Sequence, residues 1–120
     1  MEDLIKNINT LANNYNQFIN DNDLFNFTDN DWEKYNVTQN KLINSLTKLI
    51  DNNKAIKINN LDCKSSIIII SPSAKEKGKI QVTLFANERR PYSHKTFNDS
   101  ESSAYRILEI SRNWYIEKVI

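Results

Sequence analysis

Apolar side chains recur with a helical period through the first fifty residues of the chain. In the first segment they occupy positions 4, 8, 11, 15 and 18 and, beside these, positions 5, 12 and 19, while Lys6 and several Asn residues take the other side. This spacing predicts an amphipathic helix that buries one face. A second run repeats the pattern, with an apolar face made of Trp32, Tyr35, Leu42, Ile43, Leu46, Leu49 and Ile50. Residues 20–30 between the runs favour turns, so the two helices are expected to form an antiparallel pair.

The second helix has clear boundary signals. Thr28 or Asp29 is expected to be its N-cap, and Asp31 and Glu33 suit the positive end of the helix dipole. Residues 51–53, Asp-Asn-Asn, are expected to end it.

After residue 54 the period changes. Residues 55–58 predict a short strand, and residues 66–71, with four consecutive Ile, predict a buried β-branched strand. In residues 80–85 the sequence Ile-Gln-Val-Thr-Leu-Phe alternates, as expected of a strand with two different faces. Residues 92–97 are expected to return as a further strand. Together these pieces predict an antiparallel meander.

The C-terminal part supports two interpretations. Residues 98–101, Asn-Asp-Ser-Glu, offer a cap and an early acidic residue, and Ala104, Ile107 and Leu108 fit a helical face. The same stretch also alternates in part, which would suit a strand. We prefer a helix over 100–112, followed by a closing strand or docked tail over 114–120. The fold class is then α+β in a single domain, with a helix pair over 1–53 and a sheet plus helix over 54–120.

Composition mainly excludes classes of function. Sixteen Lys and Arg stand against fifteen Asp and Glu, a formal charge of +1, which disfavours a dedicated nucleic-acid binder. One Gly excludes glycine-rich phosphate loops, and one Cys with one His excludes disulfide frameworks and Cys/His zinc sites. The first residues lack the pattern of a signal peptide, and the longest apolar run, 67–70, is too short for a membrane span. A reduced, cytoplasmic protein without a metal or cofactor is expected.

Candidate catalytic groups are few and lack a supporting pattern. Cys63 and His94 are the one available nucleophile–base pair, yet nothing local predicts that they meet. Ser93 beside His94 lacks a glycine-flanked nucleophile turn. The segment Asp21-Asn22-Asp23 begins like a calcium loop, but the required Gly and closing Glu are missing. We therefore expect no enzymatic activity.

The charges are unevenly placed although they nearly cancel. Residues 21–33 hold five acidic residues and no Lys or Arg, namely Asp21, Asp23, Asp29, Asp31 and Glu33. Helix capping explains some of these, and a basic protein surface is the partner that they would fit. The same segment carries Leu24, Phe25 and Phe27, which either form a docking surface or cap the core of the helix pair. A second, basic surface is possible around Arg89, Arg90, Tyr92, His94 and Lys95.

Residues 66–112 resemble a known arrangement. A strand ending in Ser71-Pro72 is followed by a Lys/Glu-rich turn, the strand 79–85, the segment 92–100 and a capped helix. This order resembles the C-terminal part of immunity proteins from bacterial contact-dependent growth inhibition systems. The resemblance implies a small non-enzymatic protein that binds and blocks a cognate toxin, often a nuclease. It transfers no site residue, because the matching positions belong to the scaffold.

The sequence therefore predicts a binding protein that neutralises a cognate toxin or enzyme by occlusion, with the acidic residues of 21–33 facing the partner. Nucleic acid and membrane are not expected as partners. Two alternatives stay open: a ligand-binding or oligomerisation module similar to the cone-shaped folds related to nuclear transport factor 2, and a phage-encoded inhibitor of a host defence enzyme. A strand over 100–112 would favour the cone, and a helix there would favour the layered, immunity-like fold.

Overall fold

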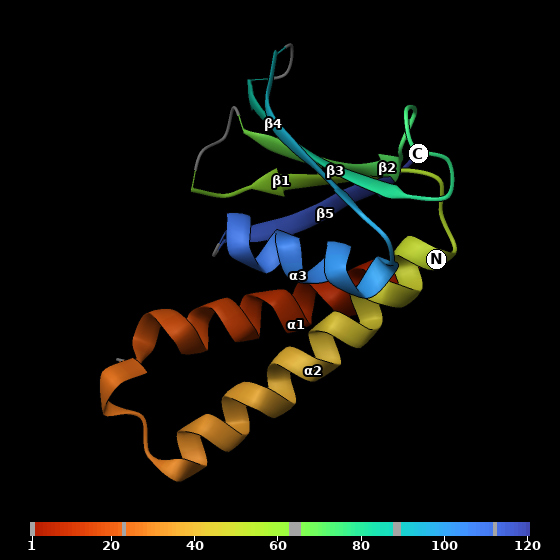
Figure 1. The fold of residues 1–120 in the computed structure, drawn as a ribbon. Coiled ribbons are helices and arrows are strands. Elements are labelled where there is room, and N and C mark those ends of the chain that lie inside the picture. The colour runs from red at the N-terminus through yellow and green to blue at the C-terminus, as the bar shows by residue number, and fades with distance from the viewer. Residues whose placement is uncertain (1, 23, 63–65, 88–89, 112) are drawn as a thin grey trace.

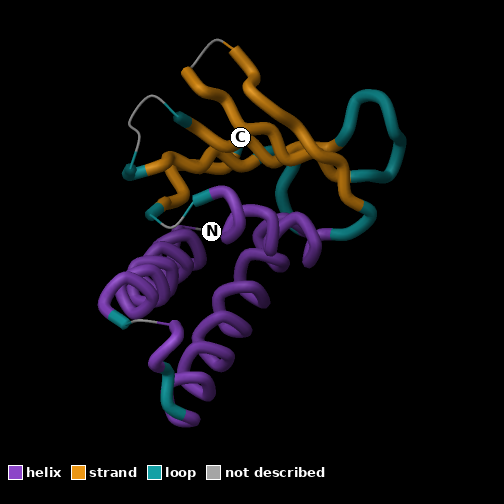
Figure 2. The backbone as a smooth tube through the Cα atoms, turned by 60° about the vertical axis from the view of Figure 1, so that its left-hand side comes forward, coloured by secondary structure: helices purple, strands orange, loops and turns teal. Residues whose placement is uncertain are grey.

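A computed structural model describes residues 2–22, 24–62, 66–87, 90–111 and 113–120. Within these residues, three α-helices lie on one face of a five-stranded sheet (Figures 1 and 2), which confirms the α+β class. The elements follow in the order α1 (Glu2–Asp21), the 3₁₀ turn η1 (Leu24–Asn26), α2 (Asp29–Asp51), β1 (Ile56–Asn60), β2 (Ile67–Pro72), β3 (Ile80–Asn87), β4 (Arg90–Phe97), α3 (Ser100–Ile110) and β5 (Trp114–Val119).

The sheet has the strand order β4-β3-β2-β1-β5, and all of its pairs are antiparallel. Strands β1 to β4 form the predicted meander. The connection from β4 through α3 spans the sheet, so the closing strand β5 pairs with β1 at the edge opposite β4. No local pattern predicted that position, because it depends on the path of α3 beneath the sheet.

Capping residues define the N-terminal boundaries of α2 and α3, which the sequence pattern left open. Thr28 is the N-cap of α2, and its hydroxyl accepts the Asp31 N–H while the Asp31 carboxylate accepts the Thr28 N–H, a complete capping box. Asp99 caps α3 by accepting the Ser102 N–H at 2.7 Å. That hydrogen bond holds the pKa of the Asp99 carboxyl below its usual value.

Residues 100–110 are therefore a helix, and the partial alternation of this segment does not produce a strand. Ala104 and Ile107 face the core from α3, and the helix ends at Ile110, two residues before the predicted end. A helix here is the outcome expected of the layered fold and not of the cone.

Alternating isoleucines of the sheet form the centre of the core. In β1 and β2 the side chains of Ile56, Ile58, Ile68 and Ile70 are at most 2% exposed and pack against the helices. The helices contribute Ile8 and Ala12 from α1, Leu42, Leu46 and Leu49 from α2, and Ile107 from α3. Trp114 and Ile116 of β5 close this core at the sheet edge.

A single side chain of α1 occupies the outer edge of β5. Asn9 donates to the carbonyl of Ile116 at 3.1 Å and accepts the Ile116 N–H at 2.7 Å. Its carboxamide thus gives Ile116 both hydrogen bonds that a neighbouring strand would give. An exposed strand edge invites pairing with another chain, so Asn9 both ties α1 to the sheet and blocks that edge at this residue.

We expect Asn9→Ala to lower the free energy of unfolding by about 1–2 kcal/mol, because it leaves the N–H and C=O of Ile116 without these partners. Asn13→Ala is the matched control, since Asn13 is exposed on the same helix and gains the same helix propensity. Urea denaturation of both variants measures the difference. Equal stabilities would show that the Asn9 clamp contributes nothing.

Candidate protein-binding site

The closed end of the helix pair extends beyond the sheet. Figures 1 and 2 show α1 and α2 running out from beneath the sheet to the η1 turn, along a molecule that measures 44 × 26 × 26 Å. The buried residues of α1 end at Asn16, and those of α2 begin at Leu42. Between these positions no described side chain is fully buried. We call residues 17–41 the hairpin tip.

An aromatic cluster holds the hairpin tip together. The ring of Phe27 lies 5.4 Å from that of Phe18, 5.0 Å from that of Trp32 and 6.2 Å from that of Tyr35, between centroids. Tyr35 also stacks on Tyr15, whose hydroxyl donates to that of Tyr35. Such pairs stabilise beyond their buried area, so they replace the sheet contacts that this end of the hairpin lacks.

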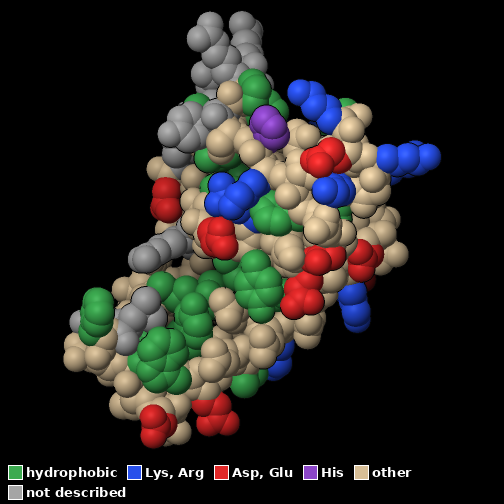
Figure 3. Space-filling view, in the orientation of Figure 1, with side chains coloured by type: hydrophobic (Ala, Val, Ile, Leu, Met, Phe, Trp, Pro, Cys, Tyr) green, Lys and Arg blue, Asp and Glu red, His purple; other side chains and the backbone are tan. Residues whose placement is uncertain are grey.

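Two aromatic residues of the hairpin tip remain accessible. Phe25, in the η1 turn, is 98% exposed, and Trp32 is 45% exposed. Phe27, for which a surface position and a position capping the core were both open, is half-buried at the centre of the cluster, and the side chain of Leu24 is not described. Hydrophobic side chains gather over this end of the hairpin in Figure 3. Phe27 therefore packs in the core of the hairpin tip, whereas Phe25 is exposed, and a docking role for Phe25 stays a prediction.

The predicted acidic residues surround this aromatic surface. Asp21 ends α1, whereas Asp29 and Glu33 lie in the first turns of α2, and all three are exposed. Asp31 is half-buried and its carboxylate serves the capping box. Asp23 lies outside the described residues. The acidic residues and the exposed aromatic rings thus share one end of the molecule.

The alternative basic surface is divided by the sheet. His94 lies opposite Thr83 and Lys95 opposite Val82, so these neighbours point to opposite faces of β4. Lys95 lies on the side of the buried Val82, which faces the helices. Arg89 lies outside the described residues, and Arg90 and Tyr92 are placed by their backbone in β4 alone. Residues 94 and 95 therefore do not present one continuous surface.

No described group of residues suggests catalysis. Cys63 lies outside the described residues, and those residues hold no cluster of His, Cys, Asp and Glu able to bind a metal ion. Burial, and then the hydrogen bond to Tyr35, raise the pKa of Tyr15 above its usual value, so this phenol stays protonated. Ser100 donates to Asp51, but this hydrogen bond joins α3 to the end of α2. None of the helices in the described residues is long and apolar enough to cross a bilayer.

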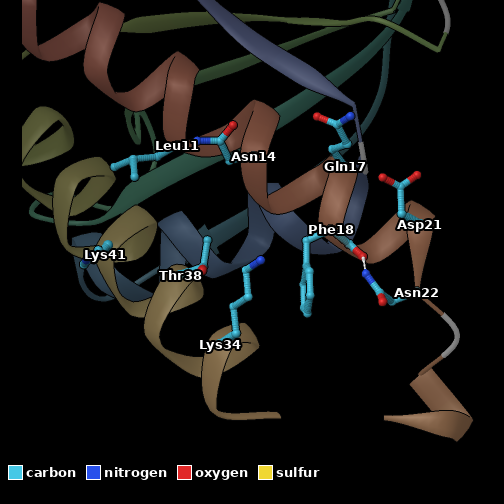
Figure 4. A pocket seen from close by; sticks show the side chains of 9 residues that line it. All are labelled: Leu11, Asn14, Gln17, Phe18, Asp21, Asn22, Lys34, Thr38 and Lys41. Carbon is cyan, nitrogen blue, oxygen red and sulfur yellow. Dashed lines mark hydrogen bonds between the residues drawn. The ribbon is translucent and has the colours of Figure 1, made fainter. Parts of the chain in front are cut away.

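A groove runs along the hairpin between α1 and α2 (Figure 4) and encloses about 550 Å³. Leu11 and Phe18 of α1 and Lys34 and Lys41 of α2 are among the residues that line it, and Asp21 lies at its outer end. The ammonium of Lys34 lies 4.9 Å from the centroid of the Phe18 ring. The seven-residue spacing of these lysines is visible in the sequence, but no local pattern there marks them as groove residues.

Comparison with protein-family models, curated proteins and solved structures gave no significant match to this chain.

We expect Phe27→Ala to destabilise the fold by about 2–3 kcal/mol, because it removes a half-buried ring and three aromatic contacts. Phe25→Ala is expected to change stability by about 0.5 kcal/mol or less, since that side chain is almost fully exposed. Thermal and urea unfolding of the two variants test the difference. A comparable loss in both would mean that Phe25 belongs to the structural cluster.

Proposed function

We propose that this chain is a binding protein that occludes a functional surface of a cognate protein toxin or target enzyme through its hairpin tip. The observation that carries the proposal is the 98% exposed Phe25, which shares the hairpin tip with the 45% exposed Trp32 and with exposed acidic residues. A partner with an apolar pocket would gain about 1.5–3 kcal/mol by burying such a side chain.

The surroundings of Phe25 support a basic partner. Asp21, Asp29 and Glu33 place exposed carboxylates on the same end of the molecule, with no Lys or Arg in residues 21–33. Complementary charge accelerates encounter and selects the partner, whereas a buried aromatic anchor supplies most of the affinity. A cleft that binds nucleic acid is electropositive, so a nuclease toxin is the kind of target that fits. Occlusion requires no catalytic group and no cofactor in this chain.

The projection of the hairpin supports occlusion as the mode of action. The tip stands clear of the sheet, so it can enter a concave site while the core keeps its packing. An inhibitor of a host defence enzyme would use the same surface in the same way.

The test is capture of the partner from the native host lysate at moderate salt, followed by mass spectrometry. We expect stoichiometric capture of one protein, and its loss when Asp21, Asp29 and Glu33 are changed to Lys together. The triple change of Glu2, Asp3 and Glu101 to Lys is the control, because it alters net charge equally and also affects acidic residues at or near helix termini.

With the captured protein purified, we expect Phe25→Ala to weaken binding about 30-fold, as for an aromatic anchor worth about 2 kcal/mol. Calorimetry measures this, together with inhibition of the partner's activity. If no protein is captured, or if the control triple variant loses the partner as the tip variant does, the hairpin tip is not the docking surface.

A further inference from the structure

The side of α2 away from Trp32 carries a stripe of lysines. Lys34, Lys41 and Lys48 are spaced by seven residues, all three are exposed, and no Asp or Glu occurs between them in the sequence. Lys34 is two residues, or about 200° of helical rotation, beyond Trp32, so the stripe and the exposed tryptophan lie on nearly opposite sides of the helix. The lysine stripe therefore differs from the acidic and aromatic surface of the proposed function, although Lys34 and Lys41 belong to the hairpin tip and Asp21 lines the groove as well. The inference does not rest on the proposed function.

Apolar side chains with the same seven-residue spacing lie beside the lysines in the groove. Leu11 and Phe18, also seven residues apart on α1, are half-exposed and line the groove beside Lys34 and Lys41. In Figure 4 the Lys34 and Phe18 side chains extend into the space between the two helices. Seven residues of helix span about 10.5 Å, so charge and apolar surface repeat together at that interval along the groove.

We propose that this groove binds an amphipathic helix of a partner protein, with carboxylates at seven-residue spacing that pair with Lys34 and Lys41 in the groove and with Lys48 further along α2. A helix is the one regular ligand whose side chains repeat at the interval of the groove, as in coiled coils. The apolar side chains of the bound helix contact Leu11 and Phe18, and the carboxylates of the bound helix lie on its side that faces α2. Asp21 lies at the outer end of the groove, so the ligand carries a Lys or Arg there.

The shape of the site favours a helix over other anionic ligands. Leu11 and Phe18 lie between the two helices. The backbone of a nucleic-acid duplex, or a flat membrane surface, reaches the lysines without contacting these two apolar side chains. The ammonium of Lys34 is already positioned over the Phe18 ring, so one ligand can neutralise the lysine and cover the ring together.

The test uses two synthetic three-heptad peptides of identical composition and comparable helicity. In the striped peptide, Glu recurs at every seventh position beside a row of Leu, with one Lys at the end that meets Asp21. In the shuffled peptide the Glu residues are spread around the helix. We expect fluorescence anisotropy at low salt to show about tenfold tighter binding of the striped peptide, and expect added salt to reduce the difference.

Charge reversal locates the binding. Lys34→Glu with Lys41→Glu is expected to remove the preference, whereas Lys75→Glu with Lys77→Glu, at exposed positions between β2 and β3, leaves it unchanged. Circular dichroism checks that each variant folds. If loss of the Lys34–Phe18 contact unfolds the first variant, the double variant Lys41→Glu with Lys48→Glu is used in its place, because it keeps that contact.

Several outcomes would overturn the proposal. These are equal affinity for the two peptides, an equal loss in the Lys75/Lys77 control, and full displacement of the striped peptide by a short DNA duplex or by anionic vesicles. Dimerisation of the wild-type chain that Lys34→Glu with Lys41→Glu abolishes would assign the groove to a second copy instead.

Discussion

The side chains of β1 and β2 alternate between the two faces of the sheet, and the isoleucines on one face form one buried cluster with residues of all three helices. Ile56, Ile58, Ile68 and Ile70 are almost completely removed from water on that face. Because hydrophobic burial is the dominant favourable term in folding, the positions of the helices follow from the need to cover these residues. Helix α3 connects β4 to β5 beneath the sheet and reaches α2 through the hydrogen bond from Ser100 to Asp51.

Because the helices are positioned by covering these isoleucines, the outer part of the helix pair has no sheet to cover. The buried residues of α1 end at Asn16 and those of α2 begin at Leu42, so the hairpin tip must be stabilised by its own contacts. The Phe27 cluster and the Thr28–Asp31 capping box provide them. Because these contacts stabilise the hairpin tip, it can hold Phe25 and the neighbouring acidic residues in solvent without weakening the core. Under the proposed function, stability and binding therefore depend on different residues of one short segment.

Long-range polar contacts complete the fold where the strands end. Asn9 joins α1 to the outer edge of β5, more than one hundred residues along the chain, by two hydrogen bonds. The groove carries Lys34 and Lys41, whereas Asp29 and Glu33 are exposed near the turn of the same hairpin. Under the two proposals, the projecting helix pair contacts two partners of different chemistry.

Local periodicity in the sequence determined the helix pair, the meander and the α+β class, because helices and strands bury one face at periods of 3.6 and 2 residues. The capping residues Thr28 and Asp99 were also predictable, since a cap acts within four residues of itself. The acidic character of residues 21–33 was visible in the same way. Tertiary structure alone decided that β5 lies beside β1, that Asn9 pairs with Ile116, and that Phe27 is half-buried while Phe25 is exposed. It also separated His94 from Lys95 and placed Lys34 over Phe18. Each of these features depends on which distant segments of the chain come into contact. The packing of the whole core determines those contacts, so the local sequence pattern does not predict them.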